Sequence, residues 1–201
     1  MAIKILAING SYRRGGIIDQ AVEAACAGAR AAGAETSTVF LSEKPVEFCL
    51  NCRSCTQEPG EKRGACVQDD GMAGLLDLAE GADGLIIAAP VNFFNVTAVT
   101  RRFMERLVPY AYWPWGAKTP AMRLKKQAKK AVLITSSAMP SLLGRAATGA
   151  LRALKGIAGT FGAASAGTLY IGLAATEEKQ RLPAWDASLA EKLGRKLGSG
   201  A

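Results

Sequence analysis

The stretch that decides the fold is residues 3–22, IKILAINGSYRRGGIIDQAV. Its first six residues are an apolar run that predicts a buried strand, and the residues from Ile17 onward predict the start of a helix. The loop between them, Asn9–Gly16, contains three glycines, one serine and two arginines. At such a junction, unpaired backbone N–H groups and the positive end of the helix dipole stabilise an anion. The stretch therefore predicts either an anion site or a plain glycine-rich turn.

The loop lacks both familiar phosphate fingerprints. It is neither Gly-x-Gly-x-x-Gly nor Gly-x-x-x-x-Gly-Lys-Ser/Thr, so dinucleotides and nucleoside triphosphates are poorly matched. A monophosphate such as that of FMN fits better, because a serine hydroxyl can donate a hydrogen bond, an arginine can neutralise charge and glycines allow close approach of the backbone. The predicted phosphate contacts are Ser11, Arg13, Gly15, Gly16 and the backbone amides of Ile17 and Ile18.

Apolar strand candidates alternate with helical stretches along the whole chain. Such alternation predicts a parallel sheet covered on both faces, an α/β architecture of the flavodoxin-like doubly wound type with five strands. The predicted strands are Ile3–Ile8, Thr36–Leu41, Gly84–Ala89, Ala131–Thr135 and Gly167–Ile171. The predicted helices are Ile17–Ala32 with Gly33 as its C-terminal cap, Met72–Glu80, Val96–Leu107, Leu142–Phe161 and Trp185–Leu197.

In this architecture, ligands bind beyond the carboxyl ends of the strands, where the loops after the first, third and fourth predicted strands meet. The loop after the third strand offers a proline, an amide and two aromatic rings that can border a heteroaromatic ring such as isoalloxazine. Small hydroxyl residues after the fourth strand can approach a ring or a ribityl chain, although hydroxyls are also common in turns. The alternative for the third-strand loop is a buried turn that ends the strand. The predicted contacts are Pro90, Val91, Asn92, Phe93, Phe94, Thr135, Ser136 and Ser137.

Composition narrows the class of protein. The 201 residues suit a single domain over 1–201, and 49% hydrophobic with 21% charged residues is typical of a globular chain. No secretory signal or membrane-spanning run is recognisable, so a cytoplasmic protein is expected. The net charge of +8 favours anionic partners. No nucleic-acid-binding module is recognisable in the sequence, so nucleic acid is not an expected partner. The chain contains no histidine, which excludes Ser-His-Asp and Cys-His catalysis while leaving cofactor-borne redox chemistry possible.

Two connections are unusually long. Ser42–Asp70 is rich in cysteine, and Pro109–Lys130 carries two tyrosines and two tryptophans before the basic run Arg123–Lys130. Connections of this length in a compact domain are usually functional or disordered. The aromatic part, Tyr110–Trp115, suits either a cover over a flat ligand or a contact between subunits. The basic run is explained by a solvated helix face or loop.

Four of the five cysteines lie in the first of these connections, as Cys49-x-x-Cys52-x-x-Cys55 followed by Cys66. Stable disulfides are not expected in a reducing compartment. The spacing allows a [4Fe–4S] cluster, a four-thiolate zinc site, or free thiols without metal. The fifth cysteine, Cys26, falls within the first predicted helix, where packing explains it.

Several motifs together resemble a known family. Gly10-Ser11-x-Arg13-x-x-Gly16, Pro90-Val91-x-Phe93 and Arg101-x-Phe103-x-Glu105-Arg106 are similar to those of the NADPH-dependent FMN reductases, and the cysteine block resembles their iron–sulfur flavoprotein branch. The resemblance implies a flavodoxin-like fold, FMN held by three strand-end loops, and a homodimer or homotetramer in which a neighbouring subunit helps to cover the flavin.

The sequence departs from the family pattern at some positions. Where members usually have Asn and then Thr or Ser after the phosphate-loop glycine, this chain has Ile17 and Ile18, so only their backbone amides are available. Asn92 stands where a tyrosine is common, and Arg101 and Glu105 replace the usual Lys and Asp. These changes concern the affinity for FMN more than the fold.

The leading functional hypothesis is an oxidoreductase in which FMN accepts a hydride from NADPH or NADH and passes electrons to a small acceptor such as a quinone, a nitroaromatic or free flavin. No side chain is expected to act as a proton donor. The alternatives are a non-enzymatic electron carrier that serves a protein partner, with or without a cluster, and a flavodoxin-like scaffold that has lost its cofactor.

Overall fold

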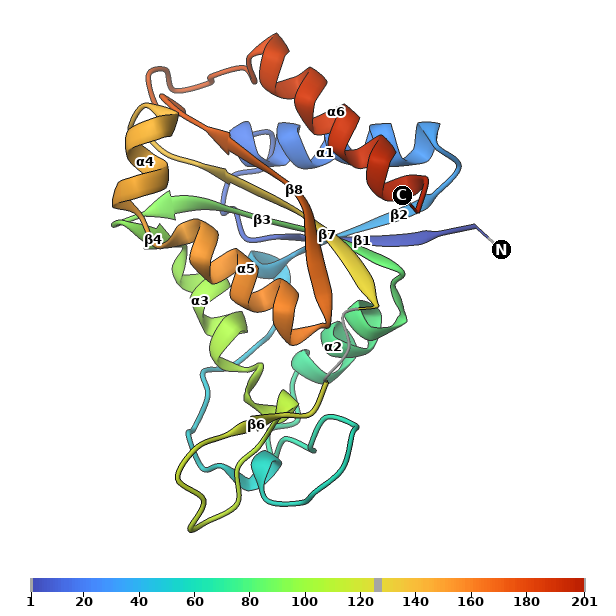
Figure 1. Cartoon of the computed structure of the whole chain (residues 1–201). Coiled ribbons are helices and arrows are strands. Elements are labelled where there is room, and N and C mark those ends of the chain that lie inside the picture. The colour runs from blue at the N-terminus through green and yellow to red at the C-terminus, as the bar shows by residue number, and fades with distance from the viewer. Residues whose placement is uncertain (1, 125–127, 201) are drawn as a thin grey trace.

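The computed structural model describes residues 2–124 and 128–200. Its centre is a sheet of five parallel strands in the order β2-β1-β3-β7-β8, the flavodoxin-like order (Figure 1). The five predicted strands are therefore confirmed. They are β1 (Lys4–Asn9), β2 (Glu35–Phe40), β3 (Gly84–Asn92), β7 (Lys129–Ser136) and β8 (Ala163–Ile171).

Helices cover both faces of this sheet because its strands bury side chains on both sides. Ile5 and Ala7 of β1 pack with α1 (Ile17–Ala31) and α6 (Ala184–Gly198). Leu6 and Ile8 point to the opposite core, which contains residues of α2 (Met72–Gly81), α3 (Ala98–Glu105) and α5 (Ala150–Thr160). Figure 1 shows α1 and α6 together above the sheet and α2, α3 and α5 below it.

Helices α1 and α6 lie in close backbone contact. A Cβ atom at Gly194 of α6 would lie only 1.8 Å from the carbonyl oxygen of Ala25 of α1, so only glycine permits this approach. This contact holds the second half of α1 against α6.

One predicted helix is wrong in its extent. Residues 142–161 form two helices, α4 (Ser141–Ala147) and α5, because Thr148 between them is extended. The backbone amide of Gly149 donates to the carbonyl oxygen of Phe94 at 2.9 Å. In a continuous helix, this amide would instead donate to the carbonyl oxygen four residues earlier in the chain. The prediction also started α3 two residues early, since Val96 belongs to a strand.

That strand, β4 (Asn95–Val96), pairs antiparallel with the end of β3. Phe93 and Phe94 form the two-residue turn between them, with φ of 46° and 65°. Positive φ at both central residues is the pattern of type I′ hairpin turns, which glycine and asparagine adopt more readily than phenylalanine. Strand β3 therefore continues three residues beyond its predicted end at Ala89, and the two rings lie at the tip of a hairpin.

The two long connections pack against each other away from the sheet (Figure 1). We call residues 46–70 and 108–123 the cysteine lobe. It contains 3₁₀ turns at Ser54–Thr56 and Val108–Tyr110 and a small antiparallel pair, β5 (Ala111–Tyr112) with β6 (Ala121–Met122). A further 3₁₀ turn, Leu41–Glu43, precedes the lobe. The Arg123 guanidinium donates to the carbonyl oxygens of Pro109, Gly60 and Glu58 at 3.0, 3.0 and 2.8 Å, which joins the two connections.

Some predictions reach beyond the described residues. The basic run Arg123–Lys130 includes residues 125–127, and the predicted domain 1–201 includes residues 1 and 201, all of which lie outside the described residues. Along the part of the chain that the structure describes, no helix has the length and apolar character needed to cross a membrane.

Candidate functional site

A cavity of about 920 Å³ opens at the carboxyl ends of β1, β3 and β7. Its position is the crevice that the doubly wound fold reserves for ligands. The loops after these three strands all contribute to its wall. The predicted site residues that line it are Ser11, Arg13, Gly15, Gly16, Ile17, Ile18, Pro90, Val91, Asn92, Ser136 and Ser137.

The first loop is shaped by hydrogen bonds to its own side chains. The buried Asn9 side chain accepts from the amide of Ser11 at 2.9 Å, and the Ser11 hydroxyl accepts from the amide of Arg13 at 3.1 Å. Gly15 has φ of 68°, a left-handed conformation that turns the chain into α1. The carboxylate of Asp19 accepts from the amide of Gly15 at 2.7 Å.

The start of α1 leaves backbone donors available for a ligand. Gly16 is the N-cap residue and supplies no side-chain cap. Among the described residues, no acceptor bonds to the amides of Ile17 and Ile18, while both side chains are buried in the core. Two amide N–H groups, a serine hydroxyl and the Arg13 side chain therefore surround one end of the cavity, and this donor set fits a phosphate monoester.

The ends of β3 and β7, with the residue after β7, form a less polar part of the wall. Pro90 and Val91 are half-buried and Asn92 is exposed. Ser136 and Ser137 are buried, and the Ser137 hydroxyl donates to the carbonyl oxygen of Met139 at 3.1 Å. A partly apolar slot with a few hydroxyl and amide groups suits a planar heteroaromatic ring.

Three predicted contacts do not line the cavity. Phe93 and Phe94 lie at the hairpin tip, and Phe93 is 96% exposed. Thr135 is fully buried, and within the described residues its hydroxyl has no hydrogen-bond partner. The sequence pattern did not reveal the positions of Phe93 and Phe94, because the strained turn and the end of β3 depend on pairing with β4. Thr135 instead lies within β7, where it is buried. The contact of all fourteen residues with a flavin remains a prediction.

The structure also places residues in the wall that sequence patterns missed. They are Tyr12, Gln20, Ala138, Ala174, Ala175 and the run Glu177–Arg181; Arg14, which the sequence offered as an alternative to Arg13, also lines the wall. The run belongs to the connection between β8 and α6, which carries no recognisable motif. The one feature of the sequence that could have indicated this run is its high density of charged residues shortly after a strand end.

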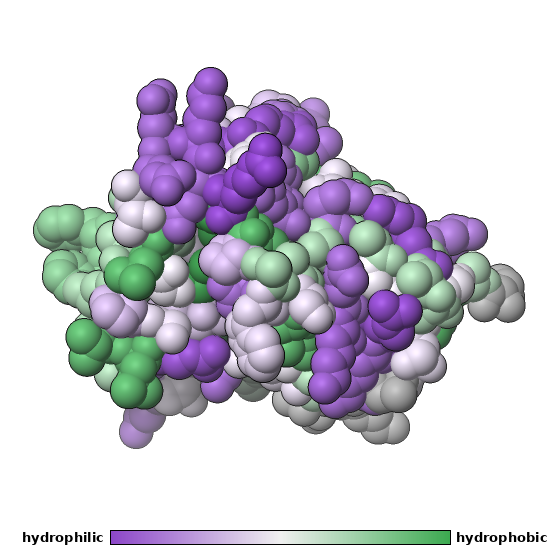
Figure 2. Space-filling view, turned by 90° about the horizontal axis from the view of Figure 1, so that it is seen from above, coloured by the Kyte–Doolittle hydropathy of each residue, from purple (hydrophilic) through white to green (hydrophobic). Residues whose placement is uncertain are grey.

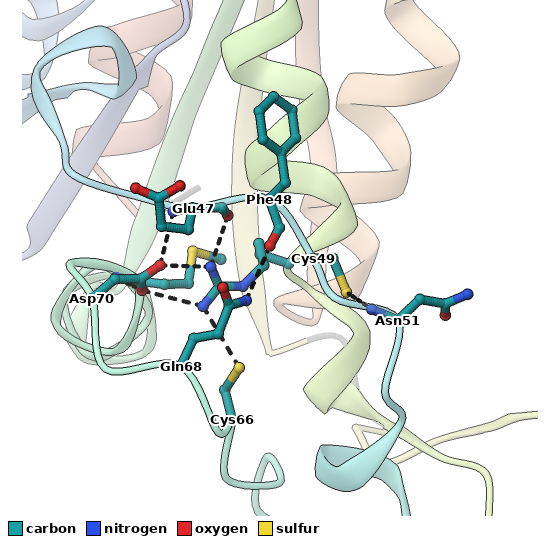
Figure 3. A network of polar contacts seen from close by, with 9 residues as sticks. Glu47, Phe48, Cys49, Asn51, Cys66, Gln68 and Asp70 are labelled. Atoms are coloured by element: carbon teal, nitrogen blue, oxygen red, sulfur yellow. Dashed lines mark hydrogen bonds and ion pairs between the residues drawn. The ribbon is translucent and has the colours of Figure 1, made fainter.

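A buried ion pair fastens the cysteine lobe to the end of α3 (Figure 3). The Arg106 guanidinium bonds to the Asp70 carboxylate at 2.6 Å, to the Glu47 carbonyl oxygen at 2.8 Å and to the Cys66 sulfur at 3.6 Å. Burial raises the pKa of Asp70, but hydrogen bonds from Arg106 and from two backbone amides outweigh it and hold the pKa below its usual range. Both ends of the cysteine segment are thus tied to one guanidinium.

The four cysteines of the lobe are free thiols, two of them half-buried and two exposed. Each of three sulfurs has its own local hydrogen-bond donor, since Cys49 accepts from the amide of Asn51, Cys52 from the Ser54 hydroxyl and Cys66 from Arg106. Over residues 2–124 and 128–200, no three Cys, Asp or Glu side chains form a group that could hold a metal ion. Ligation of a cluster or of zinc by Cys49, Cys52, Cys55 and Cys66 remains a prediction.

The aromatic segment Tyr110–Trp115 does not cover the cavity within this chain, and its role in a contact between subunits stays a prediction. Tyr110 is buried, and its hydroxyl donates to Glu80 at 2.5 Å. The Arg53 guanidinium lies over the rings of Trp113 and Trp115, at 3.7 and 4.2 Å from their centroids. Among the described residues, none of this segment lines the cavity. Its rings instead hold the two halves of the cysteine lobe together.

The chain is similar in sequence to iron–sulfur flavoproteins and in fold to NAD(P)H- and NADH-dependent oxidoreductases. An iron–sulfur flavoprotein of Archaeoglobus fulgidus is 35% identical over 112 residues, which cover 56% of this chain and 49% of that protein. The chain spans about half the length of the curated relatives it matches. Among solved structures, an NAD(P)H:quinone oxidoreductase of Methanothermobacter marburgensis superposes with a TM-score of 0.70 at 14% identity, covering 99% of this chain and 98% of that one.

A second structure, an FMN-dependent NADH-azoreductase of Bacillus anthracis in complex with FMN, gives a TM-score of 0.68 at 13% identity, covering 98% of both chains. At such low identities these likenesses establish the fold alone. The model of the family described as NADPH-dependent FMN reductase matches residues 3–174. This match spans all five parallel strands and all three loops of the cavity, and the chain therefore belongs to the NADPH-dependent FMN reductase family.

Proposed function

We propose that this chain is an NAD(P)H-dependent oxidoreductase that uses bound FMN to reduce a small electron acceptor. The observation that carries the proposal is the cavity of about 920 Å³, where the free amides of Ile17 and Ile18 share one wall with Ser11 and Arg13. Family membership supports FMN as the occupant. The FMN complex of the structurally similar azoreductase supports it as well.

In this proposal, the phosphate end is bound mainly by backbone. Ser11 and Arg13 supply a hydroxyl and a positive charge, while Ile17 and Ile18 supply amides at the positive end of α1. The amide of Gly15 is already bonded to Asp19, so it contributes less than its position suggests. Pro90–Asn92 and Ser136–Ser137 border the ring and the ribityl chain.

Bound FMN would supply the hydride and electron transfer, and the protein positions it and limits the access of water. NADPH or NADH serves as the electron donor. The proposed acceptor is a quinone, a nitroaromatic or free flavin. A cytoplasmic location is also part of the proposal.

A homodimer or homotetramer is part of the proposal. Figure 2 shows apolar residues gathered at the left of the view, the side on which Figure 1 has α4 and the β3–β4 hairpin. The exposed apolar residues of these elements are Phe93, Phe94, Leu142 and Leu143. Exposed apolar residues grouped in this way are common at contacts between subunits.

A second candidate is a non-enzymatic electron carrier. It is favoured by the name of the relatives, iron–sulfur flavoprotein, and by a cysteine lobe that carries four thiols. The basic charge of the chain, +8, counts against it. Anaerobic NADPH and NADH oxidation with FMN and a quinone separates the two: direct turnover supports the enzyme, whereas reduction only by a partner reductase supports the carrier.

A further inference from the structure

The connection between β8 and α6, residues 172–183, borders the cavity at its phosphate end. We call it the strap. Five consecutive strap residues, Glu177–Arg181, line the cavity together with Arg13, Gly15 and Gln20 of the first loop and helix. The strap thus adds a fourth wall to the three strand-end loops.

A single side chain joins the strap to the first loop. The Gln20 side-chain amide donates to the carbonyl oxygen of Gly15 at 2.8 Å and to that of Gln180 at 3.1 Å. Its oxygen accepts from the amide of Leu182 at 2.8 Å. Both donors and the acceptor of Gln20 are therefore used in one bridge between Gly15 and the strap.

Further bonds shape the strap itself. The Arg13 guanidinium donates to the carbonyl oxygen of Glu178. The Gln180 side chain donates to the Leu173 carbonyl oxygen at 2.8 Å and accepts from the amide of Thr176 at 3.1 Å, which curls the strap onto itself. The ends are fixed, because Ala174 donates to Ser137 at 2.9 Å and α6 packs against α1. Between these ends, Gln20 and Arg13 hold the strap beside the loop.

We propose that the strap closes the phosphate end of the cavity and makes the site select a flavin mononucleotide over a flavin dinucleotide, with Gln20 as the positioning residue. This inference rests on the proposed function. FMN ends at its phosphate, whereas the adenylate of FAD continues from that phosphate and has to pass the strap. The charges at this end come from Arg13, Arg14, Lys179 and Arg181 against Glu177 and Glu178, so the wall accepts one phosphate without being uniformly basic.

The test compares FMN and FAD binding in the full chain. Dissociation constants are measured by flavin fluorescence for the wild type, Gln20→Ala, Gln180→Ala and the control Glu23→Ala, an exposed residue on the same helix. The wild type is expected to prefer FMN. Gln20→Ala is expected to reduce the preference for FMN by about tenfold, since two to three hydrogen bonds are lost. Glu23→Ala leaves it within about twofold, as an exposed ion pair contributes little.

Limited trypsin digestion supplies a readout independent of flavin turnover, because Lys179 and Arg181 are exposed cleavage sites within the strap. Gln20→Ala is expected to accelerate cleavage there, and FMN to slow it in the wild type. Gln180→Ala tests the same release without altering α1, should Gln20→Ala fold poorly.

The outcomes separate the two claims. Wild-type binding of FMN with an unchanged FMN-to-FAD ratio and unchanged cleavage in folded Gln20→Ala and Gln180→Ala overturns the role of the strap and leaves the proposed function standing. A wild type that binds neither flavin overturns the proposed function and, with it, this inference.

Discussion

The carboxylate of Asp19 accepts a hydrogen bond of 2.7 Å from the backbone amide of Gly15. Its second oxygen accepts from the Asn9 side chain at 3.2 Å. A negative charge is therefore built into the loop that we propose to bind phosphate. It stabilises the start of α1 through the helix dipole and opposes an incoming anion.

Replacing this charge is expected to strengthen FMN binding. Asp19→Asn keeps an oxygen that can accept from Gly15 but removes the repulsion, so FMN affinity should rise about threefold to tenfold at low salt and by less at high salt. The free energy of unfolding should fall by about 0.5 kcal/mol, because the helix dipole of α1 loses the negative charge near its N-terminus. Fluorescence titration and urea unfolding measure both effects, with Glu23→Gln as control. Weaker FMN binding by Asp19→Asn would show that the carboxylate chiefly organises the loop.

The buried ion pair between Arg106 and Asp70 predicts a large loss of stability on truncation. Arg106→Ala leaves a buried carboxylate without its partner and should lower the free energy of unfolding by about 3 kcal/mol. The exposed Arg101→Ala, which breaks a surface pair with Glu105, should cost about 0.5 kcal/mol or less. Urea unfolding at pH 7 compares them, and equal losses would contradict the assignment.

The same pair sets a pH dependence of stability. The pKa of Asp70 is lower in the folded chain than its unfolded value, which is near 3.9. Its contribution is thus complete above about pH 5 and is lost as the pH falls through the folded pKa. The stability difference between wild type and Asp70→Asn should therefore shrink as the pH is lowered from 7 to about 3. A difference that stays constant over this range argues against the ion pair.

The thiols of the cysteine lobe should react in a defined order. Hydrogen bonds from Ser54 lower the pKa of the exposed Cys52, whereas burial and the neighbouring thiols raise that of Cys55. Burial also raises the pKa of Cys26. Iodoacetamide labelling at pH 7.5, followed by mass spectrometry, should modify Cys52 before Cys55 and Cys26 last, because the thiolate is the nucleophile. Ser54→Ala should slow the reaction of Cys52, and uniform protection of all four lobe thiols together with bound iron would instead support a cluster.

The turn at Phe93 and Phe94 predicts a stabilising substitution. Phenylalanine at positive φ costs about 1 kcal/mol or more, and Asn-Gly is the preferred pair for such turns. Phe93→Asn combined with Phe94→Gly should therefore raise the free energy of unfolding by about 1 kcal/mol. If FMN binding or the oligomeric state is lost at the same time, the rings serve one of those functions. A stability unchanged or lowered contradicts the strain at this turn.

The sequence pattern predicts the layers of the fold because they depend on local periodicity. The five apolar runs all become strands of the sheet, and Gly15 and Gly16 stand where the chain turns into α1. The break at Thr148 was not predictable, since it depends on a bond between Gly149 and Phe94, residues far apart in the sequence.

Some residues of the candidate site could likewise be predicted from the sequence, and others could not. Ser11, Pro90 and Ser136 lie at or just after the carboxyl ends of strands and are found by position alone. Gln20 and Glu177–Arg181 border the same cavity because Gln20 bonds to a strap some 160 residues later in the sequence, a contact that no local pattern encodes. Likewise, the spacing of the cysteines indicates ligands for a metal, but the segment's path around Arg106 decides where the sulfurs lie.

The central claim is that the start of α1 and Ser11 bind the phosphate of FMN. The most direct measurement is equilibrium titration of the wild type, Ser11→Ala and the exposed control Ser165→Ala with FMN and with riboflavin, which lacks the phosphate. The account predicts about one FMN per chain, weaker binding of riboflavin, and a loss of about tenfold in FMN affinity for Ser11→Ala alone. Equal affinities of the wild type for FMN and riboflavin, with Ser11→Ala unchanged, would contradict it.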